Sequence, residues 1–234
     1  MQNWRRWFLI SALLVIGPAG QAGADPIIVG APPNAASCIP FGCREADGYQ
    51  QIYSAALFPA PFTISSIAFP YTIDRMSNAI DPGLYDIRLT TTSRAVGESG
   101  FNLYNEFVEG SSVVFTGFLD GSVPRGGVLS FTLPQPYTFD PAFGNLQLTI
   151  NKSGGVFFGD DGIYLDFNTQ MNGMSSSQWR SGSMNFPNPT GGLVTVFNGE
   201  TEQAPVPEPA TLLLFGSGMA ASAWARRRRR GPNI

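Results

Sequence analysis

The six residues Tyr85-Asp86-Ile87-Arg88-Leu89-Thr90 alternate large apolar side chains with polar or charged ones. Side chains of a β-strand point to opposite faces in turn, so this pattern predicts a strand with one face in a hydrophobic core and the other in water. A turn signal, Asp81-Pro82-Gly83, stands shortly before it. Half-buried strands of this kind are typical of antiparallel sheets, and we expect the fold to be built from them.

Similar short runs recur on both sides of this stretch. Further strands are expected at 50–58, 67–73, 113–119, 128–133, 146–150, 156–158, 163–167 and 193–197. Residue pairs that accept positive φ separate several of them: Asp120-Gly121, Gly126-Gly127, Gly154-Gly155 and Asp161-Gly162. Many short strands without alternating long helices predict an all-β domain, namely an antiparallel β-sandwich with jelly-roll topology.

The second strand needs an irregularity. Phe62 and Ile64 have the opposite parity to Ile67 and Phe69, so their side chains would point to the other face of a regular strand. A β-bulge near Ser65-Ser66 adds the one residue that brings all four to the same face. We therefore expect a bulge at this position.

Two other stretches depart from the strand pattern. Phe101, Tyr104 and Phe107 are three residues apart, which predicts one short amphipathic helix. Residues 168–192 are rich in Ser, Asn, Met and Gly around Trp179, and they are expected to form a long surface loop.

The N-terminus has the three parts of a secretory signal peptide. Arg5 and Arg6 precede the apolar run 8–16, and small residues then lead to Ala22-Gly23-Ala24. The run is too short for a permanent membrane span. We expect the Sec translocation machinery to export the chain and signal peptidase to cleave after Ala24, with a retained membrane anchor as the alternative.

The C-terminus has a directional order of its own. Pro207-Glu208-Pro209 is followed by the apolar stretch 210–225 and by five arginines, 226–230. The apolar stretch is expected to form a transmembrane helix. Because arginines stay on the cytoplasmic side, everything before Pro207 is placed on the far side of the membrane.

This combination of Pro207-Glu208-Pro209, an apolar helix and terminal arginines resembles the PEP-CTERM sorting signal that exosortases read. The resemblance implies that exosortase, a membrane-embedded cysteine transpeptidase, cuts near this motif after the chain has resided transiently in the inner membrane. The body would then reach the cell surface or the extracellular matrix. A tail anchor that is never cut is the alternative. Residues 84–150 also resemble bodies found ahead of such tails, which brings no assigned activity.

The chain is thus expected to divide into a signal peptide (1–24), a lead-in segment (25–48), a β-sandwich domain (49–200) and a linker with the sorting tail (201–234). The lead-in, rich in Pro, Ala and Gly, is not expected to form a packed element. It holds the chain's two cysteines, Cys38 and Cys43. Export favours a disulfide bond between them, with free thiols or an intermolecular link as alternatives.

Composition excludes several functional classes. Between the targeting ends, residues 25–204 carry seven basic and sixteen acidic residues, a net charge of −9. Such a surface repels phosphate backbones, so no binding of nucleic acid is expected. Histidine is absent, which removes the common general base and the Ser-His-Asp and Cys-His arrangements. The protein is therefore predicted not to be an enzyme and to need no cofactor.

Carboxylate pairs could still support glycoside hydrolysis without histidine. Glu98, Glu106 and Glu109 are the nearest approach to a cluster, and they are expected to be solvated surface charges.

Four residues are candidates for binding a metal ion or a sugar. Asp160, Asp161 and Asp166 are weak candidates for calcium, but Asp161 is already explained by a turn, so no metal site is expected. Trp179 is the candidate for stacking on a glycan, or else it covers the local core.

Together these features predict an exported, non-enzymatic β-sandwich in the cell envelope or in the exopolysaccharide matrix of a biofilm. Its role is expected to be structural or glycan-interacting, with extracellular polysaccharide as a partner. The alternative is a secreted, carboxylate-dependent polysaccharide hydrolase. A buried acidic pair facing a cleft would favour the enzyme, whereas surface aromatics would favour binding.

Overall fold

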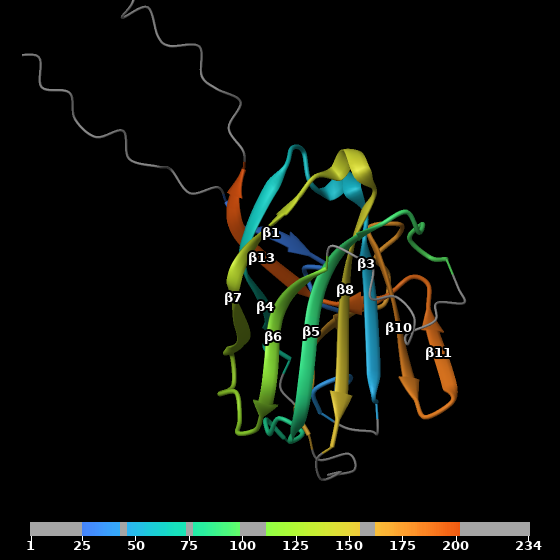
Figure 1. The fold of residues 1–234 in the computed structure, drawn as a ribbon. Coiled ribbons are helices and arrows are strands. Elements are labelled where there is room, and N and C mark those ends of the chain that lie inside the picture. The colour runs from blue at the N-terminus through green and yellow to red at the C-terminus, as the bar shows by residue number, and fades with distance from the viewer. Residues whose placement is uncertain (1–24, 43–45, 74–76, 99–110, 155–161, 202–234) are drawn as a thin grey trace, which may run out of the picture.

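The computed structural model describes residues 25–42, 46–73, 77–98, 111–154 and 162–201 (Figure 1). In these ranges the chain forms thirteen strands and two single-turn 3-10 helices, Ala55–Leu57 and Pro141–Phe143. Each pair of neighbouring strands in the sheets is antiparallel. The all-β prediction is confirmed. Among these residues, no helix has the length and apolar character that a membrane span requires.

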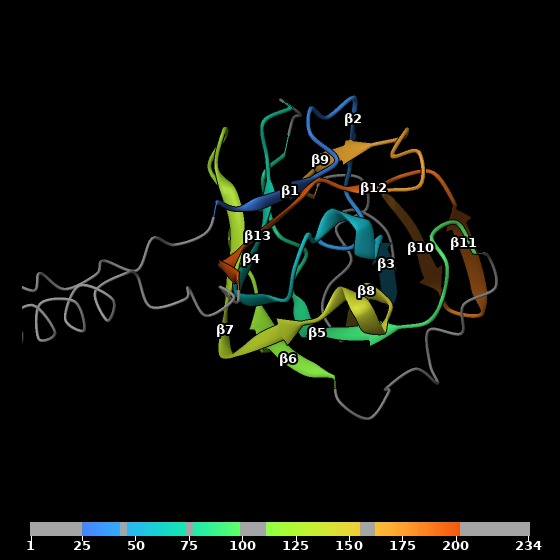
Figure 2. The same ribbon diagram turned by 90° about the horizontal axis from the view of Figure 1, so that it is seen from above.

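The strands form two large sheets and one small one (Figures 1 and 2). The four-stranded sheet has the order β1 (Ile27–Val29), β13 (Thr195–Thr201), β4 (Phe62–Pro70) and β7 (Val128–Phe139). The six-stranded sheet has the order β11 (Met184–Asn188), β10 (Ser175–Ser181), β3 (Gly48–Tyr53), β8 (Asn145–Ser153), β5 (Gly83–Thr92) and β6 (Ser112–Leu119). The small sheet has the order β12 (Gly192–Leu193), β9 (Leu165–Asn168) and β2 (Ala35–Ser37).

The two large sheets face each other across one hydrophobic core (Figure 2). Aromatic rings join them: Tyr53 of β3 meets Phe197 of β13 edge-on at 4.9 Å between ring centroids. At the far side, Phe115 of β6 lies 5.5 Å from Phe131 of β7. Rings of this size bury large apolar areas, so these contacts stabilise the packing of one sheet on the other.

The strand at 85–90 has the predicted sidedness. Tyr85, Ile87 and Leu89 are buried, whereas Asp86 and Arg88 of β5 are partly exposed on the other face. The alternation therefore decides which face of the six-stranded sheet is left outside.

The predicted bulge in β4 is also confirmed. The register of β4 against β7 shifts between Ile64 and Ser66, and Ser65 has no partner in either neighbouring strand. Phe62, Ile64, Ile67 and Phe69 are all fully buried. The extra residue thus keeps both halves of the apolar pattern on the core face.

Two expectations were wrong. The lead-in 25–48 contributes strands, because β1 pairs with β13 and β2 pairs with β9. The expected loop 168–192 contains the β10–β11 hairpin, and Trp179 lies in β10. β10 lacks apolar alternation because its buried positions are polar and hydrogen-bonded, as where Gln51 Nε2 donates to Ser175 Oγ at 2.9 Å.

Several expected elements lie outside the described residues. These are the signal peptide 1–24, the helix around 101–107, the strand 156–158 and the sorting tail from 202 onward. The jelly-roll order of the strands stays a prediction.

Candidate functional site

The outer face of the six-stranded sheet carries a row of residues that runs across the strands. Residues directly opposite each other in antiparallel strands point to the same face. One such register line crosses β6, β5, β8, β3 and β10 at Thr116, Asp86, Asn151, Gly48 and Arg180. Strand pairing therefore brings polar side chains from distant parts of the sequence into one line.

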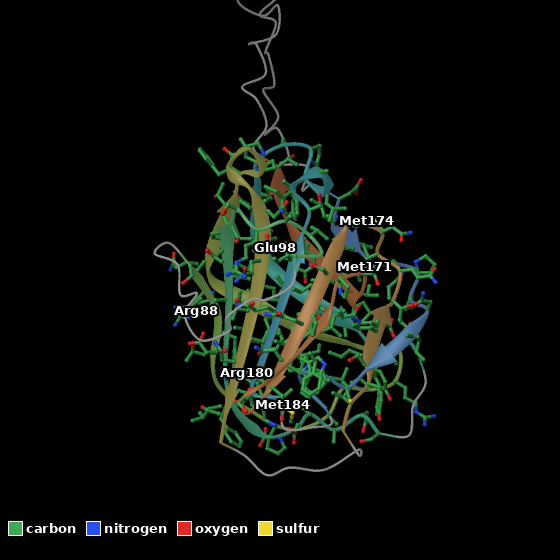
Figure 3. The ribbon with its side chains drawn as sticks, turned by 90° about the vertical axis from the view of Figure 1, so that its right-hand side faces the viewer. Arg88, Glu98, Met171, Met174, Arg180 and Met184 are labelled. Carbon is green, nitrogen blue, oxygen red and sulfur yellow. The ribbon has the colours of Figure 1, made fainter. Side chains whose placement is uncertain are left out.

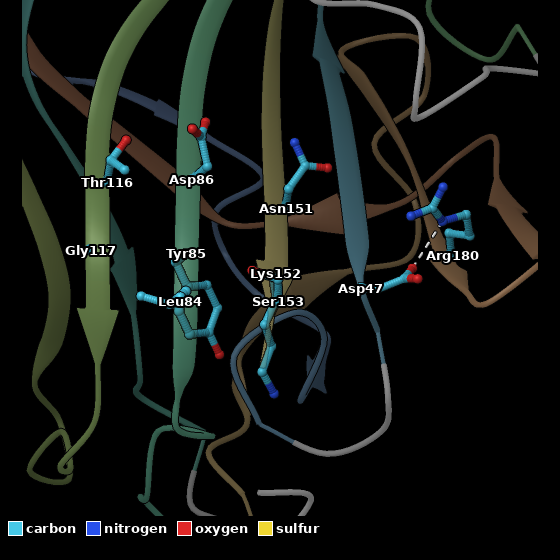
Figure 4. A pocket seen from close by; sticks show the side chains of 10 residues that line it. All are labelled: Asp47, Leu84, Tyr85, Asp86, Thr116, Gly117, Asn151, Lys152, Ser153 and Arg180. Atoms are coloured by element: carbon cyan, nitrogen blue, oxygen red, sulfur yellow. Dashed lines mark hydrogen bonds and ion pairs between the residues drawn. The ribbon is translucent and has the colours of Figure 1, made fainter. Parts of the chain in front are cut away.

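A cavity of about 630 Å³ lies along this row (Figure 4). It reaches from Thr116 on β6 to Arg180 on β10, and Leu84 and Ser153 also line it. Gly48 lies in the row between Asn151 and Arg180 and adds no side chain to it. The side chains of the row therefore come from four of the five strands.

Each acid that lines the cavity is paired with a base. Arg180 Nε lies 2.9 Å from Asp47 Oδ1 (Figure 4). Arg88 holds Asp86 with two bonds, from Nε to Oδ1 at 2.6 Å and from the terminal Nη2 to Oδ2 at 3.0 Å. This hydrogen bonding raises the pKa of Arg88 above its ordinary value. The two arginines are labelled in Figure 3, and together the pairs leave the cavity wall locally neutral.

A buried ion pair lies at one end of the cavity. Lys152, the only lysine of the chain, forms an ion pair with the fully buried Asp81, and its Nζ lies 5.9 Å from the centroid of the Tyr85 ring. The Tyr85 hydroxyl donates to the Asp81 carbonyl at 2.7 Å. Burial and then the Asp81 carboxylate raise the pKa of Tyr85. These contacts hold the start of β5 in place beside the cavity.

Two exposed apolar side chains border the polar row. Leu84 and Phe118 are direct partners in the β5–β6 pairing, and 53% and 57% of their surfaces are exposed. Because they share the outer face with Asp86 and Thr116, they add a small apolar shelf to one side of the row.

The C-terminal tail matches a protein-family model. The model describes the PEP-CTERM protein-sorting motif and matches residues 205–230, which include Pro207, Glu208 and Pro209. This chain is a PEP-CTERM domain-containing protein. The motif marks an exported protein that exosortase processes and that is targeted to the cell surface. A search of curated proteins and a search of solved structures each found no match.

Trp179 of this PEP-CTERM protein does not lie in the row. It points to the opposite face of β10 from Arg180, and its ring stacks on Phe186 with centroids 3.9 Å apart and 10° between the planes. It lines a second cavity of about 330 Å³ together with residues of β2 and β9, including Ala35 and Phe167. A glycan contact at Trp179 stays a prediction.

Asp166 has a structural role. It is buried, and its carboxylate accepts hydrogen bonds from the backbone N–H groups of Thr72 and Ile73 at 2.8 and 3.0 Å and from the Thr72 hydroxyl at 2.6 Å. Asp160 and Asp161 lie outside the described residues. Within those ranges, no group of three or more His, Cys, Asp or Glu residues could hold a metal ion.

The three glutamates proposed as an acidic cluster are described only in part. Glu98 is exposed, and its Oε2 accepts a hydrogen bond from the Ala95 N–H at 3.0 Å in a turn (Figure 3). Glu106 and Glu109 lie outside the described residues.

Cys38 lies in the described part of the chain and Cys43 outside it, so the disulfide bond stays a prediction. The intervening backbone is tightly folded, since the Gly42 N–H donates to the Cys38 carbonyl. A Cβ added to Gly42 would clash with the Ile163 carbonyl oxygen, which shows how closely this turn packs on the segment just before β9.

The row on the six-stranded sheet was missed from the sequence. The alternation predicts only that Asp86 and Arg88 lie on the solvent face of a strand, and the composition of 168–192 places Arg180 in a loop. The usable signal was the polar parity of 145–153, where outward residues remain polar along the whole strand. That pattern alone does not show which residues of other strands lie beside these positions.

Proposed function

We propose that this exported PEP-CTERM protein binds polysaccharide at the cell surface or in the extracellular matrix, through the cavity on the outer face of its six-stranded sheet. The observation that supports this most is the polar row Thr116, Asp86, Asn151 and Arg180 around one hollow. A concave site with a few convergent polar groups is the common form of a ligand site.

The chemistry of the lining suits sugar hydroxyl groups. Each hydroxyl both donates and accepts, and the site offers carboxylate acceptors, guanidinium donors and the Asn151 amide, which does both. The exposed Leu84 and Phe118 provide an apolar surface for the C–H faces of sugar rings. This mixture fits a polyhydroxylated chain better than it fits a purely apolar ligand.

Binding is favoured over the hydrolase alternative by the state of the acids. Asp47 and Asp86, the two carboxylates in the cavity, are each held by an arginine. Hydrolysis needs two carboxyl groups that both act on the substrate, one as acid and the other as base or nucleophile, whereas each of these two carboxylates is engaged by an arginine. The absence of enzymatic activity stays a proposal.

The experiment is affinity electrophoresis of the exported, processed protein in gels that contain one polysaccharide each. Asn151→Ala should reduce the retardation, because it removes a central contact without disturbing an ion pair. Ser130→Ala, on the exposed side of β7 in the other sheet, is the matched control and should behave like wild type. Equal retardation of Asn151→Ala and wild type would place the binding elsewhere, and Trp179→Ala then tests the second cavity.

We also infer that the fold is a jelly roll. Support comes from the orders β1-β13-β4-β7 and β3-β8-β5-β6, in which the late strands β13 and β8 each lie between two early ones. Two Greek-key arrangements of this kind make a jelly roll. The segment β9–β12 would then be an insertion, and its hairpin adds Arg180 to the row.

A further inference from the structure

The row fits one class of ligand in one orientation. We infer that the site takes an internal stretch of a neutral, linear polysaccharide lying across the strands, an inference that rests on the proposed function. The row crosses five neighbouring strands, and the cavity along it is lined from Thr116 on β6 to Arg180 on β10. Four spacings of about 4.8 Å make its length about 19 Å, which is longer than a single sugar ring.

The direction follows from the register. Along any one strand the outward residues alternate with buried ones, so a ligand lying parallel to a strand would meet a polar side chain only at every second residue. Across the strands, Asp86 has Thr116 on one side and Asn151 on the other. Four of the five strands add a side chain to the row, at intervals of one or two strand spacings, and such repeated contacts suit a chain of repeated units.

The neutrality of the ligand follows from the charges. The charged lining residues Asp47, Asp86, Lys152 and Arg180 each belong to an ion pair that is neutral by itself: Asp47–Arg180, Asp86–Arg88 and Asp81–Lys152. Among the described residues that line the cavity, there is no surplus of positive charge that could attract a uronic acid or a phosphate. The net charge of −9 on residues 25–204 repels polyanions as they approach.

Occupation of internal sugar units follows from the shape of the hollow. Gly48 is the position of the row without a side chain, so a chain that crosses β3 there would contact Asn151 on one side and Arg180 on the other. A valine at this position would project to the outer face and divide the hollow in two. The chain would then lose contact with one half of the row.

The test measures affinity against ligand length by isothermal titration with the processed protein. The neutral probes are β-1,4-linked gluco- and manno-oligosaccharides from disaccharide to hexasaccharide, and oligogalacturonides of equal length are the acidic ones. Affinity for one neutral series should rise at least about tenfold from disaccharide to tetrasaccharide and then level off. Gly48→Val should abolish this rise while disaccharide binding persists, and Ser130→Val, a matched strand substitution, should leave it intact.

The outcomes separate the two proposals. If the protein binds none of the probes and no gel polysaccharide, the proposed function itself is wrong. If it binds, but the disaccharide is as good as the hexasaccharide or the oligogalacturonides are preferred, the transverse neutral chain is wrong and the binding function stands. Thermal unfolding of Gly48→Val must match wild type to within a few degrees. Should it not, Thr116→Ala at the end of the row replaces it, and that variant should weaken hexasaccharide more than disaccharide binding.

Discussion

Lys152 and Asp81 form an ion pair in which both side chains are largely buried. Lys152→Met would leave the Asp81 carboxylate buried without its partner, and Asp81 Oδ1 already has no hydrogen-bond partner among the described residues. Removing one member of such a pair costs about 3–5 kcal/mol of the free energy of unfolding. Urea unfolding should show this loss for Lys152→Met.

The double variant Asp81→Asn, Lys152→Met is the matched control. Because it removes both charges, most of the lost stability should return. A loss below about 1 kcal/mol for Lys152→Met alone would contradict a buried pair.

Tyr49 and Tyr53 should make the folded protein less stable at alkaline pH. Burial is the main cause that raises the pKa of both hydroxyl groups. The Tyr49 hydroxyl is hydrogen-bonded to Gln51, and the Tyr53 hydroxyl is hydrogen-bonded to Thr195. Below pH 10 both tyrosines are neutral in the folded and the unfolded chain. Above it the unfolded chain releases protons and the folded one does not, so the free energy of unfolding should fall by about 1.4 kcal/mol per pH unit for each tyrosine.

Urea unfolding at about pH 8 to 11 measures this slope. Tyr53→Phe should reduce it by one tyrosine's share, while Thr195 keeps its bond to the Leu193 carbonyl. A stability that is constant over this range would show that the tyrosines titrate normally in the fold.

At the scale of elements, the bulge in β4 decides the face on which its first half lies. Deleting Ser65 would turn Phe62 and Ile64, both fully buried, towards solvent. Exposing two such side chains costs about 3–6 kcal/mol, so the deletion variant should be largely unfolded by circular dichroism and urea titration.

Ser65→Ala keeps the extra residue and loses only the exposed bond from Ser65 Oγ to the Asn198 carbonyl. It should change the free energy of unfolding by less than about 0.5 kcal/mol. If the deletion is as stable as Ser65→Ala, the strand must have found another register, and the account of the bulge is wrong.

At the scale of the whole molecule, the first and last described strands of the chain lie side by side, at the same end of the domain. β1 pairs with β13, and Thr201 is level with Phe62 at the end of the four-stranded sheet (Figure 1). The cavity residues Leu84 and Ser153 lie at the other end of the six-stranded sheet, where β5 begins and β8 ends. A protein held by its C-terminal tail would therefore present the cavity away from the point of attachment.

The fate of that tail can be tested at Glu208. If exosortase reads the motif, Glu208→Ala should leave uncut, membrane-associated precursor that still carries arginines 226–230. A simple anchor would be indifferent to this substitution, since its stability comes from the apolar stretch and the arginines. The measurements are the apparent mass and the membrane fraction in hosts with and without the sorting enzyme. Full-length, membrane-bound protein in all samples would contradict processing.

The sequence by itself determined the C-terminal sorting motif, the all-β class, the sidedness of β5 and the bulge near Ser65. Each of these depends on residues close together in the chain, where parity, charge order and a short motif carry the information. β10 could not be predicted in this way, because its buried positions are serines and a glutamine whose partners lie far away in sequence.

Only the tertiary structure decided where the candidate site lies. Gly48, Asp86, Thr116, Asn151 and Arg180 form one row because the pairing of five strands sets their register. The tertiary structure also buries Asp166 in a structural role and places Trp179 on the face of β10 opposite to Arg180. Strand pairing joins residues distant in sequence through backbone hydrogen bonds that are nearly the same for every side chain, so the local pattern specifies a face and leaves the neighbour across the sheet undetermined.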